Sequence, residues 1–189
     1  VKINASGAKV WDKRFGGSGD DVCRDAIATT DGGYLLVGDS NSVANGDKSE
    51  GTRGGNDYWA VKINASGAKV WDKRFGGSIT DYGKRVVSTT DGGYLLAGVS
   101  NSNADGDKSE DTRGNYDYWA VKINASGAKV WDKRFGGSAM DQCFGVIPTT
   151  GGGYLLAGYS KSPADGDRSE GTRGNYDYWA VKIDANGNK

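Results

Sequence analysis

The side chains of this sequence best suited to acid–base chemistry are aspartates that recur at fixed places. One set follows each Gly-Gly-Ser segment and a second set precedes each Tyr-Trp pair: Asp21, Asp81 and Asp141; Asp57, Asp117 and Asp177. Two carboxylates can act as acid and base, but the chain has no histidine, the commonest general base and metal ligand. A pair that recurs in every repeat also differs from an active site, which is normally single. We therefore expect these aspartates to accept backbone hydrogen bonds at turns, and we expect no enzymatic activity.

The segment Asn101–Glu110 suggests a different chemistry, because its oxygen-bearing side chains alternate like those of a calcium-binding loop. The candidate ligands lie on either side of Gly106: Asn101, Asn103, Asp105 and Asp107. Val43 and Pro163 replace Asn103 in the other repeats, so the ligand set does not recur. Charged residues do recur, and we expect four of them to brace the loop by pairing among themselves: Asp107, Lys108, Glu110 and Arg113. Calcium is the alternative, and no other cofactor is expected.

Three tandem copies of a 60-residue unit account for this recurrence. The segment VKINASGAKVWDKRFGGS occurs unchanged three times, and the first two copies are identical at 44 of 60 positions. The sequence therefore predicts three repeats followed by the start of a further repeat or a strand that closes a ring: 1–60, 61–120, 121–180 and 181–189.

The differences between the copies are concentrated. Nine of the 16 differences between the first two copies fall within positions 19–28 of the unit. Their size, charge and polarity all change, so we expect most of these side chains to be exposed rather than to share one core environment. The ligand-facing positions that this predicts are Val22, Arg24, Asp39, Tyr82, Lys84, Val99, Gln142, Phe144 and Tyr159. Neutral drift of an exposed edge is the alternative explanation.

Short strands joined by tight turns must position these residues. The 32 glycines and two prolines suit such turns and do not suit helices. In the second unit, alternation and turn residues predict two hairpins joined by Gly-Gly-Ser, with strands at Asp57–Ile63, Lys69–Phe75, Tyr82–Thr90 and Tyr94–Gly98. A long polar loop, 101–116, follows them.

Four antiparallel strands in each of three repeats predict an all-β fold made of β-propeller blades. A β-trefoil also contains three four-stranded repeats. Its unit is usually shorter, and its barrel must close within one chain. The repeat length therefore favours the propeller.

The unit also resembles a known family. It reads D-Y-W-x-V-K-x-[DN]-x-x-G, then W, then F-G-G-S-x-x-D, then T-x-D-G-G-Y-L-L-x-G-x-S. This pattern resembles the glycine-rich, delta-60-type propeller repeats of secreted Bacteroidetes proteins, which are similar to pyrroloquinoline-quinone-type and WD-type blades. The third copy departs from it at Gly151, where the others have Asp31 and Asp91. The resemblance implies a secreted or cell-surface propeller and implies no reaction.

The composition limits the partners. Lys+Arg and Asp+Glu are balanced at 24 each, so no net field attracts nucleic acid or an anionic membrane. No apolar run is long enough to cross a bilayer. The two cysteines occupy equivalent places in separate copies, where the second copy has Gly83, and we expect Cys23 and Cys143 to be free thiols that fill small buried sites.

These observations lead to an extracellular recognition or adhesion module that binds a glycan or a surface protein. A passive spacer inside a longer repetitive surface protein is the alternative. We also expect association between chains. The segment Asp177–Ile183 repeats the strand Asp-Tyr-Trp-Ala-Val-Lys-Ile once more at the C-terminal end. The first unit starts at Val1 and lacks the leading Asp-Tyr-Trp-Ala of this strand. Such ends can pair head to tail, either in a homodimer that forms a six-bladed ring or with neighbouring repeats of a longer chain.

Overall fold

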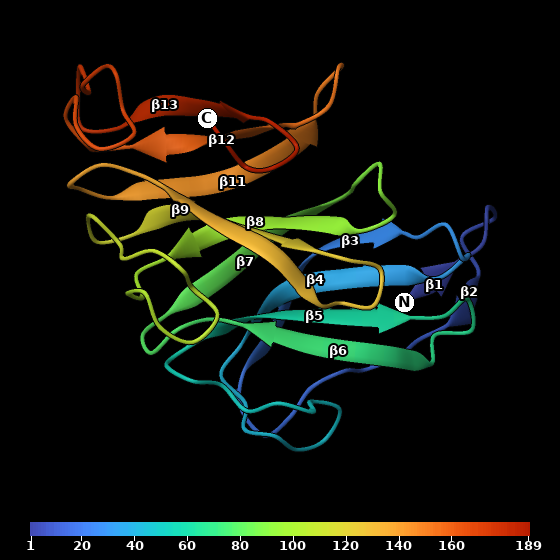
Figure 1. Ribbon diagram of the computed structural model, residues 1–189. Coiled ribbons are helices and arrows are strands. Elements are labelled where there is room, and N and C mark those ends of the chain that lie inside the picture. Colours follow the sequence, from blue (N-terminus) through green and yellow to red (C-terminus); the bar gives the residue numbers. More distant parts are fainter.

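The computed structural model describes all residues, 1–189, and contains only β-strands, arranged as four antiparallel sheets (Figure 1). The N-terminal hairpin consists of β1 (Lys2–Ile3) and β2 (Lys9–Trp11). The first sheet contains β3 (Asp21–Ala28), β4 (Tyr34–Ser40), β5 (Asp57–Ile63) and β6 (Lys69–Phe75). The second contains β7 (Asp81–Ser88), β8 (Tyr94–Ser100), β9 (Asp117–Ile123) and β10 (Lys129–Phe135). The third contains β11 (Asp141–Pro148), β12 (Tyr154–Ser160) and β13 (Asp177–Ile183). No helix is present that could cross a membrane.

The sheets are offset from the sequence repeats. Strands follow one another in chain order across each sheet, from β3 to β6 and from β7 to β10. The first sheet therefore begins at Asp21 and ends at Phe75, instead of matching the unit 1–60. The reason lies in the links between strands: Gly76-Gly77-Ser78 carries the chain from one sheet to the next, whereas the long loop 101–116 connects two neighbouring strands of one sheet. Each full sheet thus combines strands from two consecutive copies.

The predicted strands and turns are largely confirmed. The bounds of β5 and β6 match the expected ranges, and β8 runs two residues further, to Ser100. At the hairpin turn, the Asn64 side chain accepts hydrogen bonds from two backbone amides, those of Ser66 and Ala68, at 3.0 and 2.9 Å. Gly67, with φ of +82°, closes this turn. The other residues of the turn are exposed, whereas Gly67 is buried because the ring of Trp11 lies against it.

The core lies between the sheets. Every residue of β5, β8 and β9 is buried, because each of these strands has a neighbour on both edges and a packed layer on its faces. One apolar cluster joins the first and second sheets and another joins the second and third. A smaller cluster joins the N-terminal hairpin to the first sheet through Trp11, Phe15 and Trp59. The order of layers is therefore hairpin, first, second and third sheet (Figure 1).

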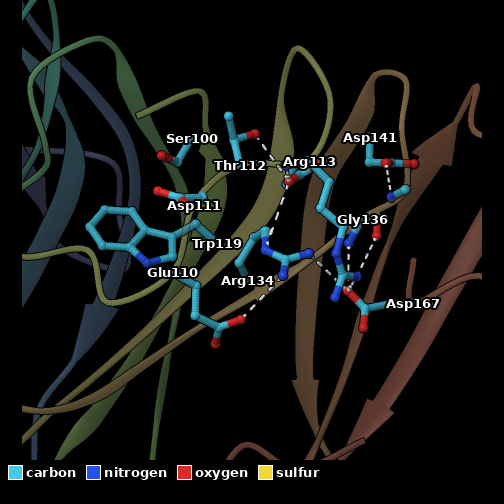
Figure 2. A network of polar contacts seen from close by, with 12 residues as sticks. Ser100, Glu110, Asp111, Thr112, Arg113, Trp119, Arg134, Gly136, Asp141 and Asp167 are labelled. Carbon is cyan, nitrogen blue, oxygen red and sulfur yellow. Dashed lines mark hydrogen bonds and ion pairs between the residues drawn. The ribbon is translucent and has the colours of Figure 1, made fainter. Parts of the chain in front are cut away.

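The charged residues of the long loops brace neighbouring copies rather than one loop, which corrects our expectation. Arg113 forms an ion pair of 2.7 Å with Asp167, a residue of the next copy. Glu110 pairs instead with Arg134 of the neighbouring strand, at 3.3 Å. Figure 2 shows Arg134 between the carboxylates of Glu110 and Asp167. Of the four charged side chains, only that of Lys108 makes a contact inside the loop, where its ammonium donates to the Glu110 backbone carbonyl.

Leu96 and Leu36 occupy equivalent places and offer a matched test of this packing. Leu96 is fully buried between the first and second sheets, whereas Leu36 is only half-buried, beneath the small hairpin. We expect Leu96→Ala to lower the free energy of unfolding by about 2–5 kcal/mol through cavity formation, and Leu36→Ala to lower it less. Chemical denaturation of both variants measures the difference. A loss below about 1 kcal/mol for Leu96→Ala would mean that this joint is not a packed core.

Candidate ligand-binding site

Four of the positions that vary between copies lie together in space, at one end of each sheet. In the first sheet, Val22 of β3 is paired with Asp39 of β4, and Asp39 is paired with Tyr58 of β5. Cross-strand partners share a face of a sheet. Two more residues contact Asp39 and belong to the same group. They are Arg24, two residues after Val22 on β3, and Asn56, just before β5. We call positions 22, 24, 39 and 56, and their equivalents, the varied cluster of each copy.

The first varied cluster is held by charge. The Arg24 guanidinium donates two hydrogen bonds to the Asp39 carboxylate, one from Nε and one from Nη2 at 3.3 Å. These hydrogen bonds to Asp39 raise the pKa of Arg24. Asn56 Nδ2 donates a further hydrogen bond to Asp39 Oδ2 at 3.1 Å. This cluster therefore presents a fixed guanidinium group at the surface.

The second varied cluster is mixed. The rings of Tyr82 and Tyr116 lie 6.2 Å apart, and the Lys84 ammonium lies 4.7 Å from the Tyr82 ring centroid. Burial lowers the pKa of Lys84. Arg24 of the first cluster lies 6.0 Å from the same Tyr82 ring, so the first two clusters form one continuous surface.

The third varied cluster is aromatic. Phe144 and Tyr159 have ring centroids 5.6 Å apart, and Tyr159 meets Tyr176 edge to face at 4.8 Å. The Lys161 ammonium lies 4.2 Å from the Tyr176 ring centroid. Tyr159 and Tyr176 line an open hollow of about 720 Å³ together with Tyr178. The arrangement can stack flat or apolar groups against several rings at once.

Two of the predicted site residues are not exposed. Asp39 and Val99 are each only 1% exposed, because position 39 lies on a central strand and the next sheet covers it. Their counterpart Tyr159 is partly open because no sheet follows the third one. Val22 and Phe144 are exposed, at 41% and 43%, as expected. The remaining predicted residues lie partly or fully at the surface: Arg24, Tyr82, Lys84 and Gln142.

One position of the cluster was missed. Asn56, Tyr116 and Tyr176 occupy equivalent places just before the third strand of each sheet, and each contacts its own cluster. The signal was present in the sequence, since this position also differs between copies. It lies far along the chain from the varied window 19–28, and only the folding of the sheet brings the two together.

The recurring aspartates hold turns, as predicted. Asp81 Oδ2 accepts hydrogen bonds from the Gly77 amide at 2.8 Å and from the Ser102 hydroxyl at 3.0 Å. Asp117 Oδ2 accepts one from the Arg113 amide at 2.7 Å. Burial raises the pKa of both carboxyls to about 6. Asp81 therefore fixes the link between two sheets, and Asp117 fixes the long loop between β8 and β9.

The oxygens of the calcium-like loop are used in the same way. Asn101 Oδ1 accepts a hydrogen bond from the Thr80 amide at 2.9 Å, and Asp105 Oδ1 accepts one from the Ser78 amide at 2.8 Å. Asp107 Oδ2 contacts the Gly76 amide and the Arg53 guanidinium of the preceding copy. The backbone carbonyl of Asn103 accepts the Asp105 amide at 2.8 Å. These contacts clamp the link between β6 and β7.

No protein-family model matches this sequence, and no curated protein matches it either. Six chains of solved structures do match in fold. One is a protein of unknown function from Bacteroides caccae, which is 14% identical, with 98% of this chain and 71% of that chain covered and a TM-score of 0.38.

Calcium binding is tested by removing the metal. Because the side-chain oxygens of Asn101, Asp105 and Asp107 already accept hydrogen bonds, we expect EDTA to leave the melting temperature unchanged. Thermal unfolding followed by circular dichroism, with and without added calcium, measures this. A rise of several degrees with calcium that is lost in the Asp105→Ala variant would establish a calcium site in this loop.

The raised pKa values of Asp81 and Asp117 predict a pH dependence. Both carboxyls bind protons more tightly in the folded chain, at about pH 6, than in the unfolded chain, near pH 4. Protonation therefore stabilises the fold, and the free energy of unfolding should fall as the pH rises from about 4 to about 7. Asp81→Asn should make this fall smaller, whereas Asn at the exposed Asp12 should leave it unchanged. Urea unfolding at several pH values measures both. An unchanged slope in Asp81→Asn would contradict the assignment.

Proposed function

We propose that this chain is a non-enzymatic, extracellular β-propeller module that binds a ligand through its varied clusters. The fold part of the proposal rests on three features: four strands run in chain order across a sheet, a short link leads to the first strand of the next sheet, and the sheets pack face to face. Blades of a propeller are built and joined in this way. The ligand class that we propose first is a glycan, with a surface protein second.

One observation carries the binding proposal: four of the positions that vary between copies form one spatial cluster per sheet, while a tyrosine contact between sheets recurs unchanged. Tyr58 and Tyr118 make the same hydrogen bond across successive joints, each at 3.0 Å. In the clusters, by contrast, an Arg–Asp pair is replaced first by two tyrosines with a lysine and then by three aromatic rings. A constant scaffold with a changing surface is the usual arrangement of a recognition protein.

The chemistry of the clusters favours a ligand with apolar faces and hydroxyl groups. Tyrosine and arginine are enriched where proteins bind partners, because they combine a large contact area with a hydrogen-bonding group. Sugar rings offer apolar C–H faces that stack on aromatic rings and hydroxyls that bind a guanidinium or a phenol. Phe144, Tyr176 and Arg24 supply both kinds of contact.

A passive spacer is the second candidate. It is favoured by the contacts that the varied side chains make with one another, such as Tyr159 with Phe144 and Tyr176, which satisfy them without a ligand. In this case the side chains of the clusters would only fill space at one end of each sheet.

Array binding separates the two candidates. We expect the chain to bind a subset of a glycan array or of an array of host surface proteins, and Phe144→Ala or Tyr82→Ala to weaken that binding at least tenfold. Ile147→Ala is the matched control, because Ile147 is exposed on the same strand as Phe144 but lies outside the clusters. Equal binding by all variants, or none by the parent chain, would favour the spacer.

A further inference from the structure

The outer face of the third sheet carries a tyrosine whose counterparts are buried. Tyr178 is 99% exposed, whereas Tyr58 and Tyr118, at the same place in the first and second sheets, are 0% exposed. The three residues lie in identical Asp-Tyr-Trp-Ala-Val-Lys-Ile strands. The difference therefore comes from position alone: each of the other two tyrosines lies under the next sheet, and no sheet covers Tyr178.

The buried tyrosines show what such a ring requires. Tyr58 Oη donates a hydrogen bond of 3.0 Å to the backbone carbonyl of Trp119, and the two rings lie 4.9 Å apart. The ring rests on two glycines of the second sheet: a Cβ on Gly83 would lie 3.3 Å from Tyr58 Cγ, and a Cβ on Gly98 would lie 2.7 Å from Tyr58 Oη. We call this set of three residues, here Gly83, Gly98 and Trp119, the tyrosine seat.

The seat occurs a second time with the same chemistry. Tyr118 Oη donates to the Trp179 carbonyl at 3.0 Å, with ring centroids 4.8 Å apart. Gly158 and Cys143 take the places of Gly98 and Gly83, and Cys143 is buried in the same apolar cluster as Tyr118. The residue at this position is small, cysteine or glycine, because the tyrosine ring lies against it and leaves no room for a larger side chain.

A third seat is present and empty on the first sheet. Cys23, Gly38 and Trp59 stand at the equivalent positions and line one cavity of about 430 Å³ on the face that looks toward the N-terminal hairpin. Cys23 is exposed there, which corrects the expectation that both thiols are buried. The chain thus carries a tyrosine without a seat at one end and a seat without a tyrosine at the other.

At each joint between sheets, one arginine makes two further contacts, and residues equivalent to these partners lie at the two ends of the stack. Arg53 pairs with Asp107 and donates to the Gly76 carbonyl at 3.0 Å, and Arg113 repeats both contacts one copy later. Arg173, the next equivalent, is exposed. Asp47 is the matching carboxylate at the start of the chain, where its Oδ2 accepts the Gly16 amide at 3.2 Å.

The strand edges match as well. In the first sheet β5 pairs with β6, with Tyr58 opposite Phe75 and Trp59 opposite Arg74. The third sheet ends at β13 and has no fourth strand. The segment equivalent to β6 is Lys9–Phe15, and only its first part is paired, as β2 with β1. Since Val181-Lys182-Ile183 repeats Val1-Lys2-Ile3, β13 can replace β1 and pair further along, to Phe15.

We propose that two copies of this chain join head to tail, with Tyr178 of each copy in the Cys23–Gly38–Trp59 seat of the other. The two ends cannot meet within one chain, because the first and second sheets separate the third sheet from the hairpin (Figure 1). Two copies related by a twofold axis satisfy both seats, both strand edges and both Arg173–Asp47 pairs at once. This proposal requires no ligand, although Tyr178 also lines the hollow beside Tyr159 and Tyr176.

Light scattering during gel filtration tests the joint. The parent chain should have about twice the mass of a single 19.9 kDa chain. Tyr178→Ala should shift it to the single-chain mass with unchanged circular dichroism, because the removed side chain makes no packing contact within its own chain. Cys23→Tyr, which fills the seat, should have the same effect, and Val130→Ala, at an exposed site on β10, should not.

Thiol labelling gives a second readout that does not depend on mass. In the joined pair Cys23 lies under Tyr178, so a thiol reagent should label it at least tenfold more slowly than in the Tyr178→Ala variant. Cys143 serves as the internal control, because it is buried in both forms and burial raises its pKa to about 12. A parent chain of single mass overturns the proposal. The proposal is also overturned if the parent chain and the Tyr178→Ala variant associate equally and the thiol reagent labels Cys23 at the same rate in both.

Discussion

The joint between sheets depends on the absence of a side chain at one glycine of each central strand. A Cβ on Gly98 would stand 2.0 Å from the Tyr82 carbonyl oxygen and 2.7 Å from the Tyr58 hydroxyl. The same conflict would arise at Gly158, with Gln142 and Tyr118. The tyrosine hydroxyl can reach the tryptophan carbonyl of the next sheet only because glycine has no side chain at this position. The close packing of the sheets and the burial of Tyr58 and Tyr118 depend on this close approach.

Buried charges form a second constraint. Lys62 and Lys122 are buried, and each is paired with an aspartate of the preceding turn, Asp31 or Asp91, at 2.8 and 2.9 Å. The Lys62 hydrogen bond is the largest of the causes that hold the pKa of Asp31 well below its usual range. In the third copy Gly151 replaces the aspartate, and Lys182 is exposed. The copy at the open end of the stack is thus the one that lacks this pair, which is consistent with its thinner packing.

The sequence was sufficient to predict the local structure and insufficient to predict how strands are grouped. Alternation along Asp57–Ile63 and the Asn64–Gly67 turn are local properties, and both were predicted correctly. The grouping was missed because Gly76-Gly77-Ser78 is as short as a hairpin link, although it crosses between sheets. Burial of Asp39 and Val99 was missed for a related reason: variation between copies indicates exposure only where no neighbouring sheet covers the position.

The offset between repeats and sheets affects the thermodynamics of the whole chain. Because each full sheet combines strands from two consecutive copies, no copy can lose its structure without removing strands from a neighbour. Stability then behaves as a sum of nearest-neighbour terms along a one-dimensional lattice, with a cost at each uncovered end. Adding a unit leaves the end cost unchanged and contributes one more interface, so the free energy of unfolding per unit rises with the length of the array.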